Sequence, residues 1–247
     1  MDKLIYVAMS GAREAMRAQA TTSHNLANLS TTGFRALRNI LDSAPIPGAG
    51  LPSRVNTVRE PELWNSRQGP SQATGRELDI SIQGQGWLVV QDEDGNDAYT
   101  RAGDLRINTN GILETAAGLP VRGNGGPVSI PPYEKLFIGD DGQISIVPQG
   151  QTAESLVQVD RLRLVNPPAL DLVRSGNGLF SLRDGSAAVP DPAVRVASGQ
   201  LESSNVNPAE ALAEMIEMSR HYEMQVRAMN TADELDSASA RLIRMNG

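Results

Sequence analysis

The acidic stretch DEDGND, residues 92–97, is the first candidate for chemistry, because carboxylates at fixed spacing can bind calcium. An EF-hand loop needs glycine at its sixth position and glutamate at its twelfth. Here Gly95 is fourth, Asp97 is sixth and Gly103 is twelfth, so the spacing does not match. The stretch is therefore expected to be a solvated hairpin turn.

The two histidines, His24 and His221, lie in opposite terminal segments of the chain. They can meet if those segments pair, but two imidazoles without a nearby acidic cluster make a poor metal site. His24 fits better as a neutral hydrogen-bonding group in a helix seam. No metal and no cofactor is expected.

Acidic residues in the middle of the chain allow one enzymatic alternative. Glu77, Asp79, Asp92 or Asp104 could supply two carboxylates for glycoside hydrolysis, with Trp87 as a platform for the sugar. No spacing singles out a pair, and turns commonly carry such acids. The glycine clusters do not open a helix, which disfavours phosphate binding. An enzyme with a small-molecule substrate is therefore not expected, and a glycan-acting extracytoplasmic enzyme is a remote alternative.

The amino-acid composition excludes several classes of partner and of chemistry. The 247 residues include 22 Lys and Arg against 29 Asp and Glu, without a basic run, which argues against nucleic-acid binding. The chain has no cysteine, so disulfides and thiolate chemistry are excluded. The longest N-terminal apolar run, residues 4–9, is too short to cross a bilayer and lacks the pattern of a secretory signal. Neither membrane insertion nor a cleaved signal peptide is expected.

The N-terminal segment is predicted to be a helix with a narrow apolar seam. Apolar or small residues recur at alternating spacings of three and four, which is a heptad pattern. The pattern contains Ile5, Ala8, Ala12, Ala15, Thr22, Leu26 and Leu29, with Gln19 in one slot. Alanines allow close helix approach but bury too little area to stabilise a two-helix hairpin by themselves.

The C-terminal segment is the strongest helix prediction. Asn207 is a good N-cap, Pro208 fits the first helical position, and Glu210 stands where a capping box needs it. The helix is predicted to run to about residue 244, with the seam slipping by one residue after Met229. Its seam contains Leu212, Met215, Ser219, Tyr222, Val226 and Met229.

Charge suggests that the two ends pair. Residues 1–39 carry five basic and two acidic side chains, whereas residues 208–247 carry four basic and seven acidic ones. Opposite signs suit lateral pairing, although each exposed pair contributes little. Two ordinary solvated faces would show the same bias.

The middle of the chain reads as short strands. Turn signals at Asp94-Gly95, Asn110-Gly111, Asp141-Gly142 and Asp184-Gly185 separate apolar runs and predict hairpins. The expected fold class is α+β, with long terminal helices (1–36 and 204–247) pairing as a coiled-coil domain. An extended connector (37–69) and an inserted all-β domain (70–203) lie between them.

Five stretches together resemble the flagellar rod and hook family, in the correct order along the whole chain. They are MDKLIYVAMSGA, SHNLANLSTTGFRA, GRELDISIQGQGWLVVQ, AYTRAGDLRINTNGIL and GQLESSNVNPAEALAEMIEMSRHYE. The opening, the connector and the short length are most similar to proximal-rod members, and a distal-rod or hook-type subunit is the alternative. His24, where asparagine is usual, and Leu29-Ser30, where Val-Asn is common, depart mildly from the pattern.

The resemblance implies a structural, non-enzymatic subunit of the bacterial flagellar basal body, in the rod that crosses the periplasm. Such subunits pass uncleaved through the flagellar type III export apparatus. They then stack helically with copies of themselves and with other rod subunits, and their terminal helices line the tube.

The stretch TTSHNLANLSTTGFRA, residues 21–36, fits that role. The amides of Asn25 and Asn28 donate and accept hydrogen bonds, so they suit a crowded seam between subunits without burying charge. Gly33 can adopt the left-handed conformation that ends a helix, and Phe34 can hold the turn by packing. The expected assembly seam comprises Ile5, Ala12, Asn25, Leu26, Asn28, Gly33, Phe34, Asn205, Asn207, Pro208, Leu212, Met215, Ile216, Tyr222, Val226 and Met229.

Overall fold

The computed structural model describes residues 4–38, 41–45, 55–59, 63–150, 155–175 and 177–245. The chain forms two compact units. Residues 1–29, 36–65 and 206–247 form the helical unit, and residues 30–35 and 66–205 form the β-rich unit. A helix at each end and strands between them make an α+β fold, as the sequence predicts.

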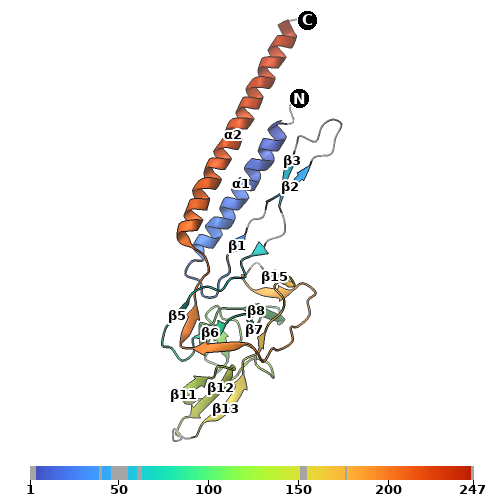
Figure 1. The fold of residues 1–247 in the computed structure, drawn as a ribbon. Coiled ribbons are helices and arrows are strands. Elements are labelled where there is room, and N and C mark those ends of the chain that lie inside the picture. The colour runs from blue at the N-terminus through green and yellow to red at the C-terminus, as the bar shows by residue number, and fades with distance from the viewer. Residues whose placement is uncertain are drawn as a thin grey trace. The chain divides into compact units, whose positions relative to one another are not determined.

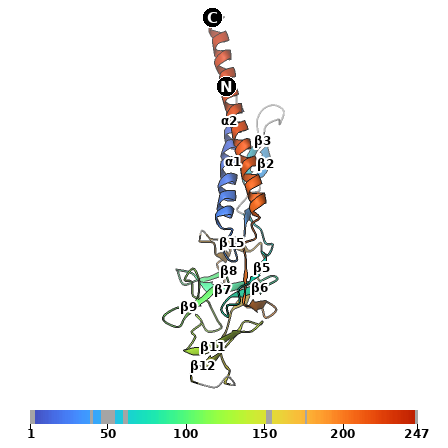
Figure 2. The ribbon, with the colours of Figure 1, turned by 90° about the vertical axis from the view of Figure 1, so that its left-hand side faces the viewer.

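Two helices dominate the helical unit. Helix α1 (Leu4–Ala27) and helix α2 (Pro208–Met245) lie side by side in both views (Figures 1 and 2), and they contact one another extensively. The predicted cap of α2 is confirmed, because the Asn207 Oδ1 atom accepts a hydrogen bond of 3.1 Å from the amide of Ala209.

The connector contributes strands to the helical unit rather than a purely extended segment. Strand β1 (Leu37–Arg38) pairs antiparallel with β4 (Leu63–Trp64), and β2 (Leu41–Pro45) pairs antiparallel with β3 (Val55–Arg59). Helix α1 contacts both β1 and β3. The part of the connector richest in proline and glycine, residues 46–54, lies outside the described residues.

The β-rich unit consists of short antiparallel strands. They are β5 (Ser71–Ala73), β6 (Ile80–Gln83), β7 (Trp87–Gln91), β8 (Asp97–Thr100), β9 (Leu105–Ile107), β10 (Leu113–Thr115), β11 (Tyr133–Ile138), β12 (Gln143–Pro148), β13 (Val157–Arg161), β14 (Leu164–Val165), β15 (Leu172–Arg174), β16 (Phe180–Leu182), β17 (Arg195–Ser198) and β18 (Gln200–Glu202). The largest sheet has the order β14-β7-β8-β16-β15, and a second has the order β11-β12-β13. Three two-stranded pairs, β9 with β10, β6 with β17 and β5 with β18, complete the unit.

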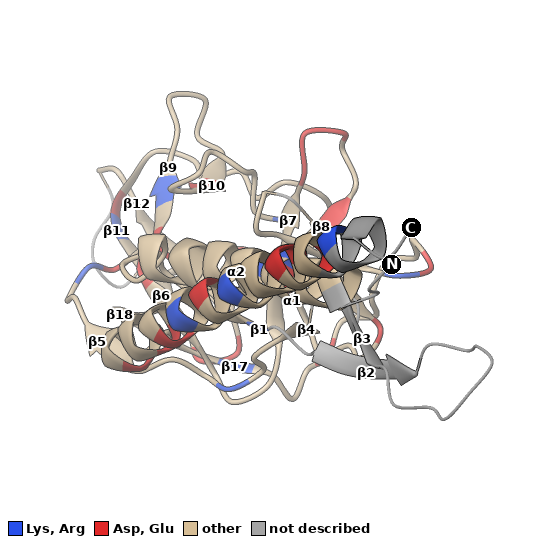
Figure 3. Ribbon diagram, turned by 90° about the horizontal axis from the view of Figure 1, so that it is seen from above, with Lys and Arg blue, Asp and Glu red and all other residues tan. Residues whose placement is uncertain are grey.

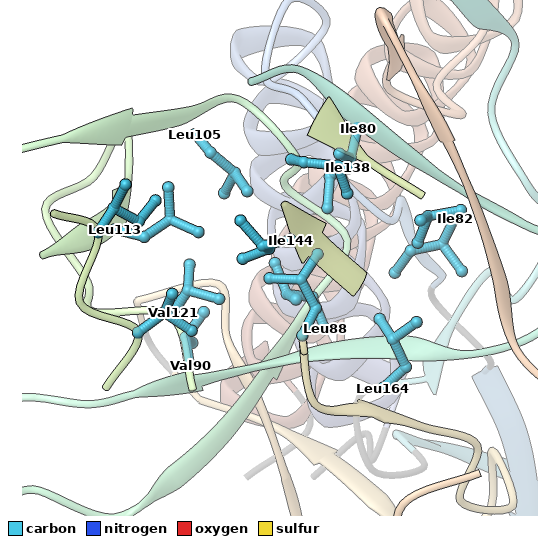
Figure 4. Close-up of a cluster of buried hydrophobic side chains, with 14 of the residues drawn as sticks. Ile80, Ile82, Leu88, Val90, Leu105, Leu113, Val121, Ile138, Ile144 and Leu164 are labelled. Carbon is cyan, nitrogen blue, oxygen red and sulfur yellow. The ribbon is translucent and has the colours of Figure 1, made fainter. Parts of the chain in front are cut away.

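Large aliphatic side chains fill the interior of the β-rich unit. Figure 4 shows residues from β6, β7, β9, β10, β11, β12 and β14 pointing toward one another. Leu105, Leu113 and Leu136 are fully buried, and Leu88 and Ile144 are nearly or fully so. Burial of this kind stabilises a fold by about 1.5–3 kcal/mol per side chain, so this unit has a complete core of its own.

Three of the predicted hairpin turns are confirmed, and the fourth is wrong in part. Gly95, Gly111 and Gly142 adopt positive φ between paired strands. Gly185 also has positive φ after β16, but no strand follows it in residues 186–192. After this turn, Pro190 forms only an isolated bridge to Val165.

Candidate assembly surface

Small side chains form the contact face of α1. The buried residues of this helix are Ala8, Ser10, Ala12, Glu14, Ala15, Ala18, Thr22 and Asn25. Ala8, Ala12, Ala15 and Thr22 are in the predicted seam, whereas the next contacts fall on Ala18 and Asn25 rather than on Gln19 and Leu26. Ile5 and Leu26 are half-buried. Two buried positions therefore fall one residue before the predicted ones, while Thr22 between them keeps its predicted place.

Helix α2 contributes a matching face. Ala211 and Ala232 are buried, and between them Met215, Tyr222, Val226 and Met229 are half-buried. Met218 and Gln225 are half-buried as well, so the face follows positions 211, 215, 218, 222, 225, 229 and 232. This spacing of three and four is that of a heptad seam.

Several of the largest apolar side chains of the two helices lie outside this contact. Tyr6, Met9 and Met16 of α1 are 69%, 52% and 57% exposed. Leu212 and Ile216, both in the predicted assembly seam, are 49% and 57% exposed. Soluble monomers rarely leave such rows of large apolar residues in water.

The charges of the two helices do not pair with each other. Arg13 and Arg17 approach the Glu14 Oε1 atom of the same helix at 3.4 and 2.9 Å. No ion pair among the described side chains involves α2, although acidic and basic residues occur along its length (Figure 3). The two ends lie together as their opposite net charges suggest, but no ion pair between the described side chains of α1 and α2 accompanies that contact.

The asparagines at the end of α1 bond within the chain. The Asn25 side chain donates to the carbonyl of Leu37 at 2.8 Å and accepts from the amide of Leu37 at 2.9 Å. It thereby holds β1 against α1 and satisfies its buried amide. The Asn28 side chain donates to the carbonyl of His24 at 2.9 Å, and the same carbonyl accepts the backbone amide of Asn28 at 3.2 Å, so Asn28 reinforces the last helical turn.

Gly33 and Phe34 belong to the β-rich unit. Gly33 has φ of 66°, and its amide donates to the carbonyl of Glu202 at 2.7 Å. A Cβ atom on Gly33 would lie 2.3 Å from the backbone of Arg101, so only glycine fits there. The Phe34 ring is 7% exposed and packs under the Arg174 guanidinium, 5.1 Å from the ring centroid.

Next to this turn, a buried carboxylate joins distant parts of the β-rich unit. We call Gly33, Arg35, Gly69, Arg101 and Glu202 the Glu202 joint. The Glu202 carboxylate is fully buried and lies 2.8 Å from Arg35 and 2.7 Å from Arg101. The amide of Gly69 donates to the same carboxylate at 3.0 Å. The joint thus connects the segments that follow α1, leave the connector and precede α2.

Both arginines of the joint are bonded further. Arg101 donates to the carbonyls of Gly86 at 2.7 Å, Ile82 at 2.8 Å and Gly84 at 3.0 Å, so it also holds the loop between β6 and β7. Arg35 donates to the carbonyl of Arg67. Burial lowers the pKa of Arg35 to about 10, with the charge of Glu202 opposing this and that of Arg101 adding to it. Arg35 therefore remains charged at neutral pH.

Asn205 extends the joint toward α2. Its side chain donates to the carbonyl of Arg67 at 2.8 Å, and its amide donates to the carbonyl of Phe34 at 3.3 Å. Sequence reasoning singled out Gly33, Phe34 and Asn205 but missed Arg35, Arg101 and Glu202. The only local signal was a charged residue inside each of the otherwise uncharged stretches TTGFRA and GQLESS.

The candidate carboxylates Asp79 and Asp104 do not form an accessible catalytic pair. The Asp79 carboxylate is fully buried, and its Oδ2 atom accepts from the Thr74 hydroxyl at 2.6 Å. Asp104 forms a backbone bridge to Asp79. Burial raises the pKa of the Asp104 carboxyl, and the negative charge of Asp79 raises it further. A substrate cannot reach the fully buried Asp79, whose carboxylate instead accepts a hydrogen bond inside the β-rich unit.

The other chemical candidates are surface features. The Asp92 carboxylate caps its own turn by accepting from the amides of Asp94 at 3.0 Å and Asn96 at 2.7 Å. His24 and His221 are both exposed. The described residues contain no cluster of three or more metal-ligating side chains, and none of the described helices has the length and apolar character that a membrane crossing requires.

Comparison with known families agrees with this geometry. Residues 5–35 match the family described as flagella basal body rod protein, and residues 197–242 match the C-terminal region of the flagellar basal body rod FlgEFG proteins. Residues 81–146 match the D1 domain of the flagellar hook protein FlgE/F/G family.

Full-length relatives extend the match. The chain is 38% identical to the flagellar basal-body rod protein FlgF of Salmonella typhimurium and 37% identical to that of Escherichia coli, each over 100% of both chains. It is 32% identical to the rod protein FlgG of Buchnera aphidicola, over 86% of this chain and 89% of that one. The chain therefore belongs to the flagellar basal-body rod protein family, and it is a structural subunit of the basal-body rod.

Proposed function

We propose that this chain is a subunit of the proximal part of the rod and that it assembles helically through α1 and α2. The observation that supports the proposal is that these helices bury small side chains and expose large apolar ones. Within the chain they meet through alanines, while Tyr6, Met9, Met16, Leu212 and Ile216 are 49–69% exposed. A neighbouring subunit that covers these residues would supply the burial that one chain lacks.

In this proposal the terminal helices act as a coiled coil inside the shaft, with the β-rich unit outside them. The heptad spacing of the α2 face supports the coiled coil. Copies of this chain and other rod subunits are the partners that cover the exposed rows. Of the predicted seam residues, the exposed Leu212 and Ile216 are the proposed contacts of this assembly, whereas Asn25, Gly33 and Phe34 make their contacts within the chain.

We further propose that the helical ends order fully only on assembly. Alanine-rich helices have little stability in water without packing, and binding then offsets the entropy of ordering. Loosely ordered ends also suit passage through the flagellar type III export apparatus without a cleaved signal peptide.

A cryo-electron-microscopy map of basal bodies from cells that make a tagged full-length chain tests the proposal. Density for this chain in the proximal rod, with α1 and α2 at the inside of the shaft, is the expected result. Density in the distal rod or the hook would favour the alternative members of the family. Complete rods that lack the tagged chain would overturn the proposal.

A further inference from the structure

The helical unit contains a hollow that neither helix fills. It has a volume of about 320 Å³ and lies between α1, α2 and β1. Its apolar wall consists of Ala18 and Thr22 of α1, Leu37 of β1 and Met218 of α2. Because the alanine and threonine side chains are small, they do not fill the space between the backbones, which corresponds to about ten water volumes.

The hollow is acidic at its α2 side. Glu214 and Glu217 line it from consecutive turns of α2, and both are exposed. Arg38 of β1 also lines it, which leaves a net charge of minus one. Neither glutamate belongs to an ion pair among the described side chains, so both carboxylates are available to a cation from outside.

The outer row of α1 has complementary chemistry. Met9, Arg13 and Met16 follow one another at spacings of four and three, and all three are more than half exposed. The Arg13 Nε atom lies 3.4 Å from Glu14, while Arg17 holds the same carboxylate at 2.9 Å. Arg13 can therefore leave Glu14 without stranding that buried carboxylate, because Arg17 remains in place.

We propose that the hollow is a socket for the Arg13 row of a second copy of this chain. The guanidinium of the incoming Arg13 bonds Glu214 and Glu217, and its aliphatic stem lies against Ala18, Leu37 and Met218. Met9 or Met16 of the same row covers the rim. The inference rests on the proposed function and adds the surface through which two copies meet. The contact joins two different faces, the Arg13 row of one copy and the socket of the next. Such a head-to-tail contact can repeat from copy to copy and gives the assembly a direction.

Cysteine cross-linking tests the socket directly, since the chain has no cysteine of its own. Cells would make two full-length forms together, one with Arg13→Cys and one with Glu217→Cys, and isolated basal bodies would be oxidised. The expected result is a disulfide-linked dimer of the two forms. A matched pair, Arg13→Cys with Glu234→Cys, also uses exposed positions on the same helices and should give only background.

Charge exchange provides a second readout. Arg13→Glu alone or Glu217→Arg alone should weaken association about two- to fivefold at low salt, and the two forms together should recover it. Basal bodies that contain the chain but give equal cross-linking in both pairs would overturn the socket and leave the proposed function standing. Basal bodies that never contain the chain would overturn the proposed function as well.

Discussion

The two units of this molecule solve the problem of burial in opposite ways. The β-rich unit encloses large aliphatic side chains and a fully buried Glu202 whose carboxylate meets two arginines. The helical unit buries mainly alanines and leaves Tyr6 and Ile216 more than half exposed. Each extra methylene buried stabilises a fold by about 0.8 kcal/mol, so alanine contacts contribute far less than leucine contacts. We infer that one unit is complete in the single chain and the other is completed by neighbours.

The largest expected effect is the loss of stability of the β-rich unit when its buried carboxylate, Glu202, is neutralised. Glu202→Gln leaves Arg35 and Arg101 buried without their carboxylate, and it should destabilise the β-rich unit by about 3–5 kcal/mol. Chemical denaturation followed by the fluorescence of the buried Trp87 measures this loss. Glu114→Gln, which breaks a pair with the exposed Arg106, should cost at most about 1 kcal/mol. Equal losses in the two variants would show that the joint does not stabilise the unit.

A glycine substitution tests the turn that begins the β-rich unit. Gly33→Ala should cost roughly 2 kcal/mol or more, because it adds a backbone clash with Arg101 to the cost of a left-handed residue. Gly75→Ala is the matched control, since Gly75 has φ of 72° and open space around it, and should cost about 1 kcal/mol. Thermal unfolding of both variants measures the difference. No difference would mean that the turn yields easily to the added methyl group.

The smallest expected effect on the free chain comes from the exposed row of α2. Leu212→Ala should change the stability of the monomer by no more than about 0.5 kcal/mol. It should nevertheless lower the amount of chain found in basal bodies, because the proposed assembly buries this side chain and the free chain does not. Leu136→Ala, in the core of the β-rich unit, should cost about 2–5 kcal/mol in the monomer. A comparable loss for Leu212→Ala would place that residue in an intramolecular core.

Local patterns predicted what local chemistry determines. Asn207 caps α2, Gly111 turns a hairpin, and the alanine spacing of α1 marks its contact face. The Glu202 joint was missed because its partners lie 101 and 133 residues away along the chain, where no periodicity can connect them. Strand β1 was missed because its place depends on two hydrogen bonds between Leu37 and the distant Asn25 of α1.

Hydrogen exchange on the full-length chain, free and in isolated basal bodies, tests the central claim most directly. In the free chain, amides of α1 and α2 should exchange quickly, while those of β7, β8 and β12 stay protected. In basal bodies, amides of α1 and α2 should become protected, because neighbouring subunits cover the exposed rows. Equal protection of the helices in the free and assembled chain would contradict a helical unit completed by its neighbours.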